Sequence, residues 1–327
     1  MPQKVNFQTV LDSLLDEDTP FPASYLHEFS DISPANLDSL LKIWPKVSPR
    51  RKHTLLEDLE DLAETDTLTS FEDLARPLLH DPEALVRVQA IRLLWESEDK
   101  KLVPVYLKFL QEDENAEVRA AAANAVGLFI YLGELEKIPP DLHHQIEDQL
   151  LGVVTSSDNI LVRRRALESL GYSGREEVIP LIESAYHDKD PDWIVSALLA
   201  MGRSCDERWK KHVLSQLHAP SQEIRSEAIV AAGELELTSA RSALLDLLDD
   251  EEDLQMRRSL VWALSKIGGE GVREKLDELI EIEEDDEEMD FLEDALENLS
   301  FTEDEQFDLF AAGSDDFNEE DLEEEDK

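Results

Sequence analysis

The sequence is poor in cysteine, aromatic residues and glycine, and each shortage excludes a class of protein. The single cysteine, Cys205, cannot form an internal disulfide bond, so we expect a reducing compartment. Aromatic residues make up 6% of the 327 residues, and glycine occurs only 11 times. A β-rich or α/β protein with many tight turns needs more glycine than this. Leu, Ala, Glu and Asp dominate instead, and this mixture favours helices.

Basic residues and long apolar runs are also scarce. The chain has 31 basic against 77 acidic residues, which gives a formal net charge of −46. Such a surface repels nucleic-acid phosphates and anionic lipids. No apolar run approaches the roughly 18 residues of a membrane span, and residues 1–6 contain no apolar signal-peptide region. We therefore expect a cytoplasmic protein without a nucleic-acid or membrane partner.

One sequence pattern recurs six times. An acidic turn, often with proline, is followed by an apolar residue, then arginine, then small residues at helical spacing, as in the segment from Asp81 to Arg87. The arginine-equivalent positions are 87, 119, 163, 196, 225 and 257, which are separated by 32, 44, 33, 29 and 32 residues. Position 196 carries serine. A period of this length predicts helix pairs that bury their apolar faces only by stacking on neighbouring pairs.

Local signals indicate where the helices of each pair begin and end. Asp-Pro at the start of a second helix supplies an N-cap followed by a preset φ. Glycines near the C-terminal ends of the second helices suit a left-handed stop, namely Gly171, Gly202, Gly233 and Gly268. The one long step results from extra residues around positions 128–142. These form either a projecting binding element or a longer turn between helices.

These features resemble HEAT repeats, in particular the short bacterial type of the phycobilin lyases. The acid-Pro turns, the Val-Arg pairs and the Ala-x-x-Ala-Leu-Gly ending carry the resemblance, which covers residues 70–282. It implies an all-α fold, a right-handed α-α superhelix of the HEAT/armadillo type. It also implies a series of ion pairs, called the ladder below, between the turn acids and the second-helix arginines of adjacent repeats. The acid lies six residues before the arginine, as in Asp81 for Arg87, and Ser196 is expected to interrupt the ladder.

The sequence predicts four segments. Residues 1–69 form degenerate N-terminal helical repeats, 70–282 the repeat array, 283–302 a capping helix and 303–327 an acidic disordered tail. From Glu281 onward there are 24 acidic residues against one basic residue, and such a segment lacks the apolar mass to fold. Its aromatic and leucine residues are either a short docking motif or incidental, namely Phe307, Leu309, Phe310 and Phe317.

The predicted second helices carry most candidate binding residues. Arginine concentrates on them, and exposed Trp and Arg are typical of interaction hot spots. The candidates are Arg92, Arg164, Trp193, Arg203, Trp209 and Arg258. In the alternative, the arginines serve the ladder and the tryptophans pack at repeat junctions. The arginine-rich surface of the second helices is expected to bind an acidic segment. The protein's own acidic tail, residues 303–327, is one such segment, so self-docking of the tail is one possibility.

Catalytic motifs are missing from the sequence. It has no P-loop, dinucleotide fingerprint or nucleophile elbow. Iron-binding HEAT proteins of the deoxyhypusine hydroxylase type use paired His-Glu motifs, and only His27-Glu28 matches here. The pair His143-His144 is interpreted as a solvated helix start. We therefore predict no catalytic, cofactor or metal site, and a non-enzymatic scaffold that binds a protein or peptide. The alternative is a bilin-lyase-like or other small-molecule-handling HEAT-repeat protein.

Overall fold

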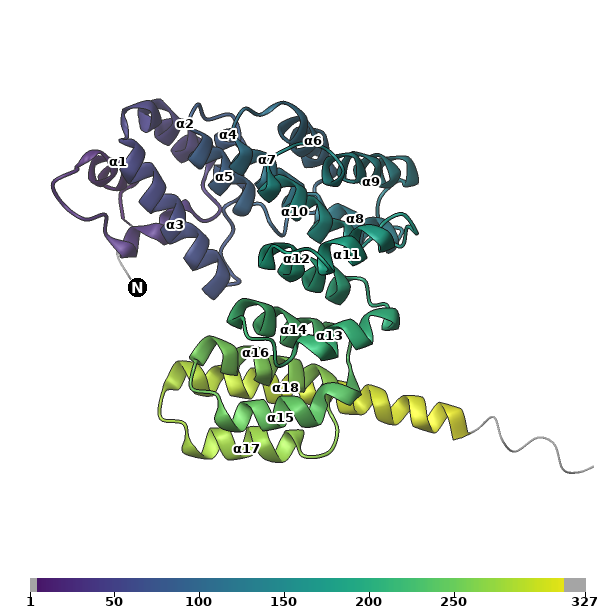
Figure 1. The fold of residues 1–327 in the computed structure, drawn as a ribbon. Helices are drawn as coiled ribbons and strands as arrows, with labels where there is room; N and C mark the ends of the chain where they lie inside the picture. Colours follow the sequence, from purple (N-terminus) through teal and green to yellow (C-terminus); the bar gives the residue numbers. More distant parts are fainter. Residues whose placement is uncertain (1–4, 315–327) are drawn as a thin grey trace, which may run out of the picture. The chain divides into compact units, whose positions relative to one another are not determined.

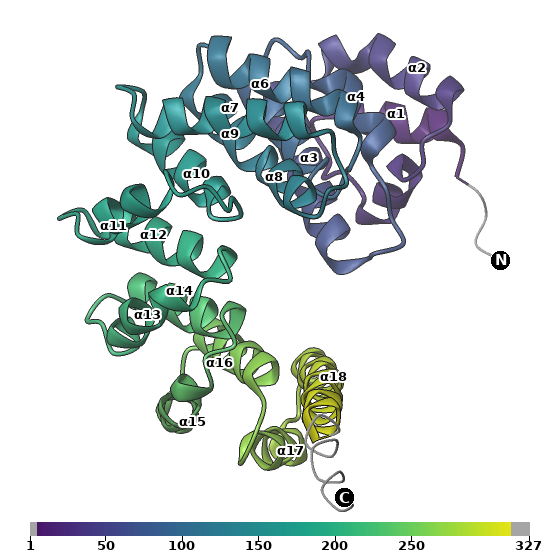
Figure 2. The same ribbon diagram turned by 90° about the vertical axis from the view of Figure 1, so that its right-hand side faces the viewer.

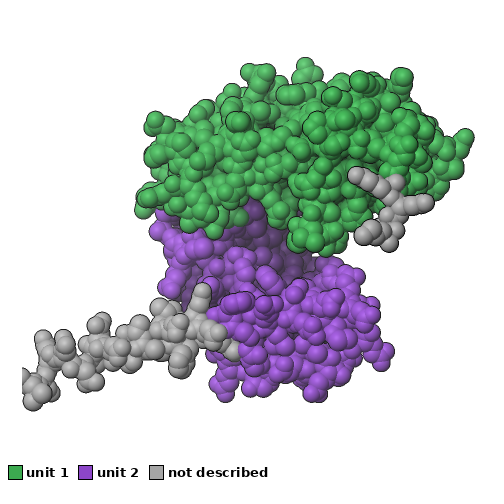
Figure 3. All heavy atoms as spheres, turned by 180° about the vertical axis from the view of Figure 1, so that it is seen from behind, with its two compact units in different colours: residues 1–178 green, residues 179–327 purple. Residues whose placement is uncertain are grey.

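The computed structural model describes residues 5–314, with side chains up to residue 302. In this part the chain forms 18 α-helices joined by turns and five short 3-10 helices, which confirms the all-α prediction (Figure 1). None of the described helices is long and apolar enough to cross a membrane. The chain divides into two compact units, residues 1–178 and 179–327 (Figure 3).

The first unit stacks helix pairs from the start of the described chain. The second helix of each pair packs on the next, so that α3 contacts α5, α5 contacts α7 and α7 contacts α10. The helices of this unit are α1 (Phe7–Leu15), α2 (Pro34–Ile43), α3 (Pro49–Thr65), α4 (Glu72–Leu78), α5 (Ala84–Arg92), α6 (Val103–Glu112), α7 (Ala116–Ala125), α8 (Gly127–Glu134), α9 (Pro140–Val154) and α10 (Ile160–Leu170).

The second unit repeats the arrangement. Figure 2 shows its second helices α12, α14 and α16 in succession, with α17 and α18 beyond them. The long helix α18 packs on α16 and α17 and so covers the last pair. The helices of this unit are α11 (Ile179–Tyr186), α12 (Pro191–Arg203), α13 (Lys210–Gln216), α14 (Gln222–Glu234), α15 (Arg241–Asp250), α16 (Leu254–Ile267), α17 (Val272–Ile282) and α18 (Asp286–Ser314).

The N-cap residue sets the register of each second helix. It lies four positions before the arginine, as Asn115 does for Arg119 and Asp253 for Arg257. Helix α12 has its N-cap at Asp190, so its equivalent position is Ile194. The assignment of Ser196 to this position was therefore wrong by two residues. Ser196 is a fully buried residue whose hydroxyl donates to the carbonyl oxygen of Asp192 at 3.1 Å.

The predicted ladder between repeats is present in the first unit. The Arg87 guanidinium binds both carboxylate oxygens of Asp113 at 3.0 Å, and it also donates to the Asp81 carbonyl at 2.9 Å. Asp113 thus gives its carbonyl to Arg119 of its own repeat and its carboxylate to Arg87 of the preceding one. Lys52 on α3 extends the ladder toward the N-terminus, because its ammonium lies 2.8 Å from Glu83.

Most of the glycines near the helix ends do not stop a helix. Gly202 and Gly233 lie within α12 and α14, where a Cβ atom would come within 3.1 Å of Ala231 and 2.8 Å of Ala263. They let neighbouring second helices approach closely. Gly171 also has a right-handed φ of −53°, so of the four glycines only Gly268 ends its helix with a positive φ, of 61°.

Two helix boundaries differ from those predicted from the sequence. The long step around residues 128–142 is an additional helix, α8, followed by a turn and the start of α9. The capping helix α18 continues to Ser314 instead of ending near Thr302. The remainder of the predicted tail, residues 315–327, lies outside the described residues.

Candidate partner-binding face

A hollow of about 200 Å³ lies on the second-helix face of the second unit. Arg258, Trp262 and Lys266 follow one another at intervals of four residues along α16, so they share one face of that helix. Val230, Gly233 and Glu234 of α14 and Phe291 of α18 complete the wall together with Gln255, Ser259 and Ala263. Trp262 is 39% exposed, so its indole presents apolar surface at this hollow.

The cations around this hollow are held by acidic neighbours. Arg258 donates to Glu288 at 2.7 Å and to Glu287 at 3.1 Å, and its guanidinium lies 5.5 Å from the ring centre of Phe291. The hydrogen bonds to Glu288 and Glu287 raise the pKa of Arg258. Lys266 lies 2.8 Å from Glu234. Because these charges are already paired, the indole of Trp262 is the main feature that this surface offers to a partner.

A second exposed patch lies on the first unit. The side chain of Arg92 at the end of α5 is 63% exposed and lies 3.5 Å from Glu60 of α3. Burial raises the pKa of Glu60 to about 7, although Arg92 opposes the shift. Trp95 follows in the turn after α5 and is 57% exposed. The patch therefore pairs a large aromatic surface with a cation, as does the hollow on α16.

The two predicted tryptophans are not exposed. Trp193 is 8% exposed and Trp209 is 2% exposed, so both belong to the core. Trp193 stands three residues after its N-cap, the position that Val118 occupies in α7, and this position points into the repeat. Trp209 packs its ring against His212, with 5.4 Å between ring centres. The expectation that these side chains are available to a partner is wrong for this reason.

The remaining candidate residues are either half-buried or lie where the structure does not describe side chains. Arg164 on α10 and Arg203 at the end of α12 are half-buried. Of the tail residues, Phe307, Leu309 and Phe310 fall in the part of α18 whose side chains are not described, and Phe317 lies outside the described residues. The docking motif and the self-docking hypothesis stay predictions.

Sequence reasoning missed Trp262 and Trp95. The signal for Trp262 was available, because it follows Arg258 by one helical turn and therefore shares its face. Trp95 had no comparable signal, since it lies beyond the end of α5. Its exposure depends on how the turn after α5 packs.

Comparisons with known proteins agree with the geometry. A family model for HEAT repeats matches residues 72–140 and 210–299. A second model, for the PBS lyase HEAT-like repeat, matches residues 162–188. No curated protein matches the chain.

Several solved structures are similar at low identity. The Escherichia coli protein YibA is 16% identical, with 87% of this chain and 98% of that chain covered and a TM-score of 0.44. Human deoxyhypusine hydroxylase in complex with glycerol is 18% identical, with 80% and 95% covered and a TM-score of 0.35. Importin beta is 13% identical, with 90% and 44% covered and a TM-score of 0.41.

Both family models describe helix-pair repeats, and they fall on the helix pairs of the structure. Together with the stacked second helices and the inter-repeat ladder, they confirm the predicted solenoid architecture. The chain belongs to the HEAT-repeat proteins.

Proposed function

We propose that this protein is a non-enzymatic scaffold of the cytoplasm that presents the second helices of its repeats to a protein or peptide partner. The observation that carries the proposal is the exposed Trp262 in the hollow between α14, α16 and α18. Tryptophan is among the residues enriched in interaction hot spots, where it fills a pocket near the centre of an interface. The net charge of −46 favours a protein partner over nucleic acid or an anionic membrane.

The small size of one hollow and the polar lining of the other support a macromolecular partner more than a small molecule. Small-molecule sites commonly enclose about 300–1,000 Å³ and are mostly apolar. The hollow at Trp262 measures about 200 Å³. A larger hollow of about 430 Å³ near the N-terminus is lined mainly by charged and hydroxyl side chains, with Phe21 as its aromatic residue.

The alternative function is bilin-lyase-like or other small-molecule handling. Its specific support is the match of residues 162–188 to the PBS lyase HEAT-like repeat. A lyase requires a groove that holds the chromophore and an acid or base beside it. Visible absorbance that co-purifies with the protein from its own cells would favour this alternative over the scaffold.

Affinity purification with matched variants tests the scaffold. We expect the Trp262→Ala variant to lose specific partner proteins that the wild type captures. Ile282→Ala is the control, because Ile282 is 70% exposed at the end of α17, away from the lining of the hollow. Quantitative mass spectrometry of the three eluates decides the question. Equal recovery of every captured protein by both variants and the wild type would contradict the proposed role of this face.

A further inference from the structure

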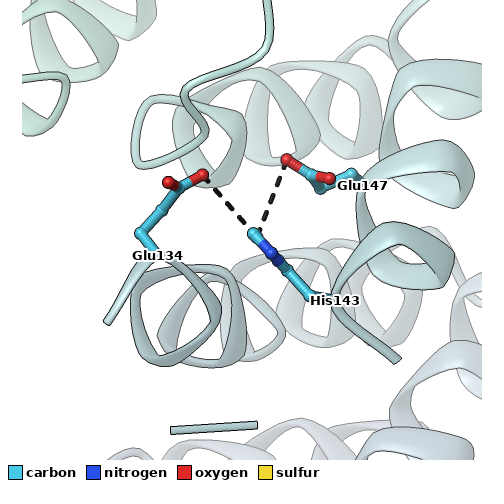
Figure 4. Close-up of side chains that lie close together, drawn as sticks. All are labelled: Glu134, His143 and Glu147. Carbon is cyan, nitrogen blue, oxygen red and sulfur yellow. Dashed lines mark ion pairs between the residues drawn. The ribbon is translucent and has the colours of Figure 1, made fainter. Parts of the chain in front are cut away.

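The additional helix α8 and the start of α9 bring three potential metal ligands together. Glu134 ends α8, and His143 and Glu147 lie one helical turn apart on α9. Figure 4 shows the imidazole of His143 between the two carboxylates. Their donor atoms all lie within 4.8 Å of one another. The cluster lies within the first unit, far along the chain from the hollow at Trp262.

The distances in this cluster are unusual for a hydrogen-bonded network. Nε2 of His143 lies 3.7 Å from Oε1 of Glu134 and 3.6 Å from Oε1 of Glu147. Hydrogen bonds of this kind measure about 2.7–3.2 Å. Nε2 is buried from solvent and has no hydrogen-bond partner. A buried imidazole nitrogen without a partner is costly unless another group occupies the space beside it.

The same distances suit the ligands of a tetrahedral metal ion. With zinc–nitrogen and zinc–oxygen bonds of about 2.1 Å, neighbouring ligand atoms in a tetrahedral site are about 3.4 Å apart. The two separations that involve His143, 3.6 and 3.7 Å, need to close only slightly to reach that value, and the ligand oxygens of the two carboxylates lie within 4.8 Å of each other. One imidazole nitrogen and two carboxylate oxygens form a donor set that zinc accepts.

The loop after α10 holds both carboxylates in place. The backbone N–H of Gly174 donates to Oε1 of Glu134 at 2.8 Å, and the hydroxyl of Ser173 donates to Oε1 of Glu147. Arg175 lies 4.0 Å from the other oxygen of Glu147, a residue that is 1% exposed. Hydrogen bonds from outside the ligand set are the usual means of orienting metal-binding carboxylates.

Gly133 fixes the position of the imidazole ring. A Cβ atom at this position would lie 2.3 Å from Cγ of His143, so only glycine lets the ring rest on the end of α8. The ring is therefore seated by packing and is not a freely moving surface side chain. Glu134, with a side chain that is 40% exposed, leaves one side of the cluster open to solvent.

We propose that Glu134, His143 and Glu147 bind a divalent transition-metal ion, with zinc as the probe. Three protein ligands leave a fourth position for water on the open side. The interpretation of His143-His144 as a solvated helix start fits His144, which is exposed, but not His143. The extra residues that lengthen one repeat thus provide a ligand, Glu134, and the turn that leads to the other two.

Zinc binding by the full chain tests the proposal. Competition against a chromophoric chelator in about 0.15 M salt should show one tight site in the wild type. Glu134→Gln should weaken this binding at least tenfold, and His143→Ala should abolish it. His144→Ala is the matched control, because it removes the neighbouring histidine, whose ring centre lies 5.9 Å away. It should retain the wild-type affinity.

Thermal melts separate a metal site from a structural ion pair. In chelator, Glu134→Gln should melt like the wild type, since its side chain is partly exposed. Added zinc should then raise the Tm of the wild type and of His144→Ala, but not that of Glu134→Gln. Equal zinc affinity in all variants would overturn the proposal, because nonspecific binding to the acidic surface would explain it. An unchanged wild-type Tm in saturating zinc would also overturn it.

Discussion

The guanidinium of Arg87 binds both carboxylate oxygens of Asp113, which lies 26 residues farther along the chain. The side chains are only 16% and 8% exposed, so solvent screens the pair weakly. The same arginine donates to two carbonyl groups of its own turn, those of Asp81 and Pro82. One side chain therefore closes its own repeat and joins it to the next.

Removing this arginine should destabilise the first unit. We expect Arg87→Ala to lower the free energy of unfolding by about 2–4 kcal/mol, because it leaves Asp113 unpaired and largely buried. Arg87→Lys should also be costly, because lysine cannot form the two parallel hydrogen bonds. Arg92→Ala is the control and should change stability by about 0.5 kcal/mol or less, since its side chain is 63% exposed. Urea denaturation measures all three, and equal losses for positions 87 and 92 would refute the ladder's role.

Substitution of the close-packed glycines should also destabilise the fold. A Cβ at Gly233 would lie 2.8 Å from the backbone of Ala263, so we expect Gly233→Ala to cost about 1–3 kcal/mol. Gly152 in α9 has no atom within 4 Å of the corresponding Cβ position. Gly152→Ala should therefore stabilise the protein by up to about 1 kcal/mol, the helix-propensity gain of alanine. Opposite signs in thermal denaturation would support the packing role, and a gain at both positions would contradict it.

The pKa of Glu60 predicts a pH-dependent stability. Burial raises this pKa from 4.5 to about 7, so between these values the folded protein binds a proton that the unfolded chain has lost. Stability from this group therefore declines as pH rises from about 4.5 to about 7 and stays reduced above. We expect Glu60→Gln to raise the Tm at pH 8 but to have little effect at pH 5. A Tm difference that does not change with pH would show that Glu60 does not titrate in this way.

The contact between Arg258 and Glu288 should couple the capping helix to α16. We expect Arg258→Glu to destabilise the second unit by about 1–2 kcal/mol, because it places like charges together. Exchange of the charges in the double variant Arg258→Glu/Glu288→Arg should recover part of this loss. Denaturation of the wild type, both single variants and the double variant completes the cycle. If the effects simply add, the two residues do not interact.

The sequence predicted the array well because its signals are local. Five of the six arginine-equivalent positions mark second helices correctly, since each follows its N-cap by the same distance. The sixth, Ser196, was misplaced because Asp190 precedes a proline as the turn acid Asp81 does, whereas Asp190 is the N-cap of its helix and Asp81 lies two residues before the N-cap Glu83. Exposure was harder to predict. The burial of Trp193 follows from that corrected register, but Trp209 ends a short 3-10 helix, where the helical spacing of the repeat gives no signal for burial.

The candidate metal cluster could be predicted only in part. His143 and Glu147 are visible as a pair one helical turn apart. Glu134 joins them only because α8 ends in a turn at Glu136, whose φ of 57° reverses the chain. Nothing in the local sequence indicates that Ser173 and Gly174, some 40 residues beyond Glu134, complete the surroundings.

The ladder has a consequence for how such a chain can be shortened or extended. Arg87 and Arg119 occupy equivalent positions, and each pairs with the acid of the following turn, Asp113 or Asp158. Excision of residues 88–119 would place Arg87 in the position of Arg119, opposite Asp158. This excision removes one whole repeat period and leaves no charged residue of the ladder without its ion-pair partner. Loss or duplication of a segment should therefore keep the ladder charges paired whenever it removes or adds one whole period in register.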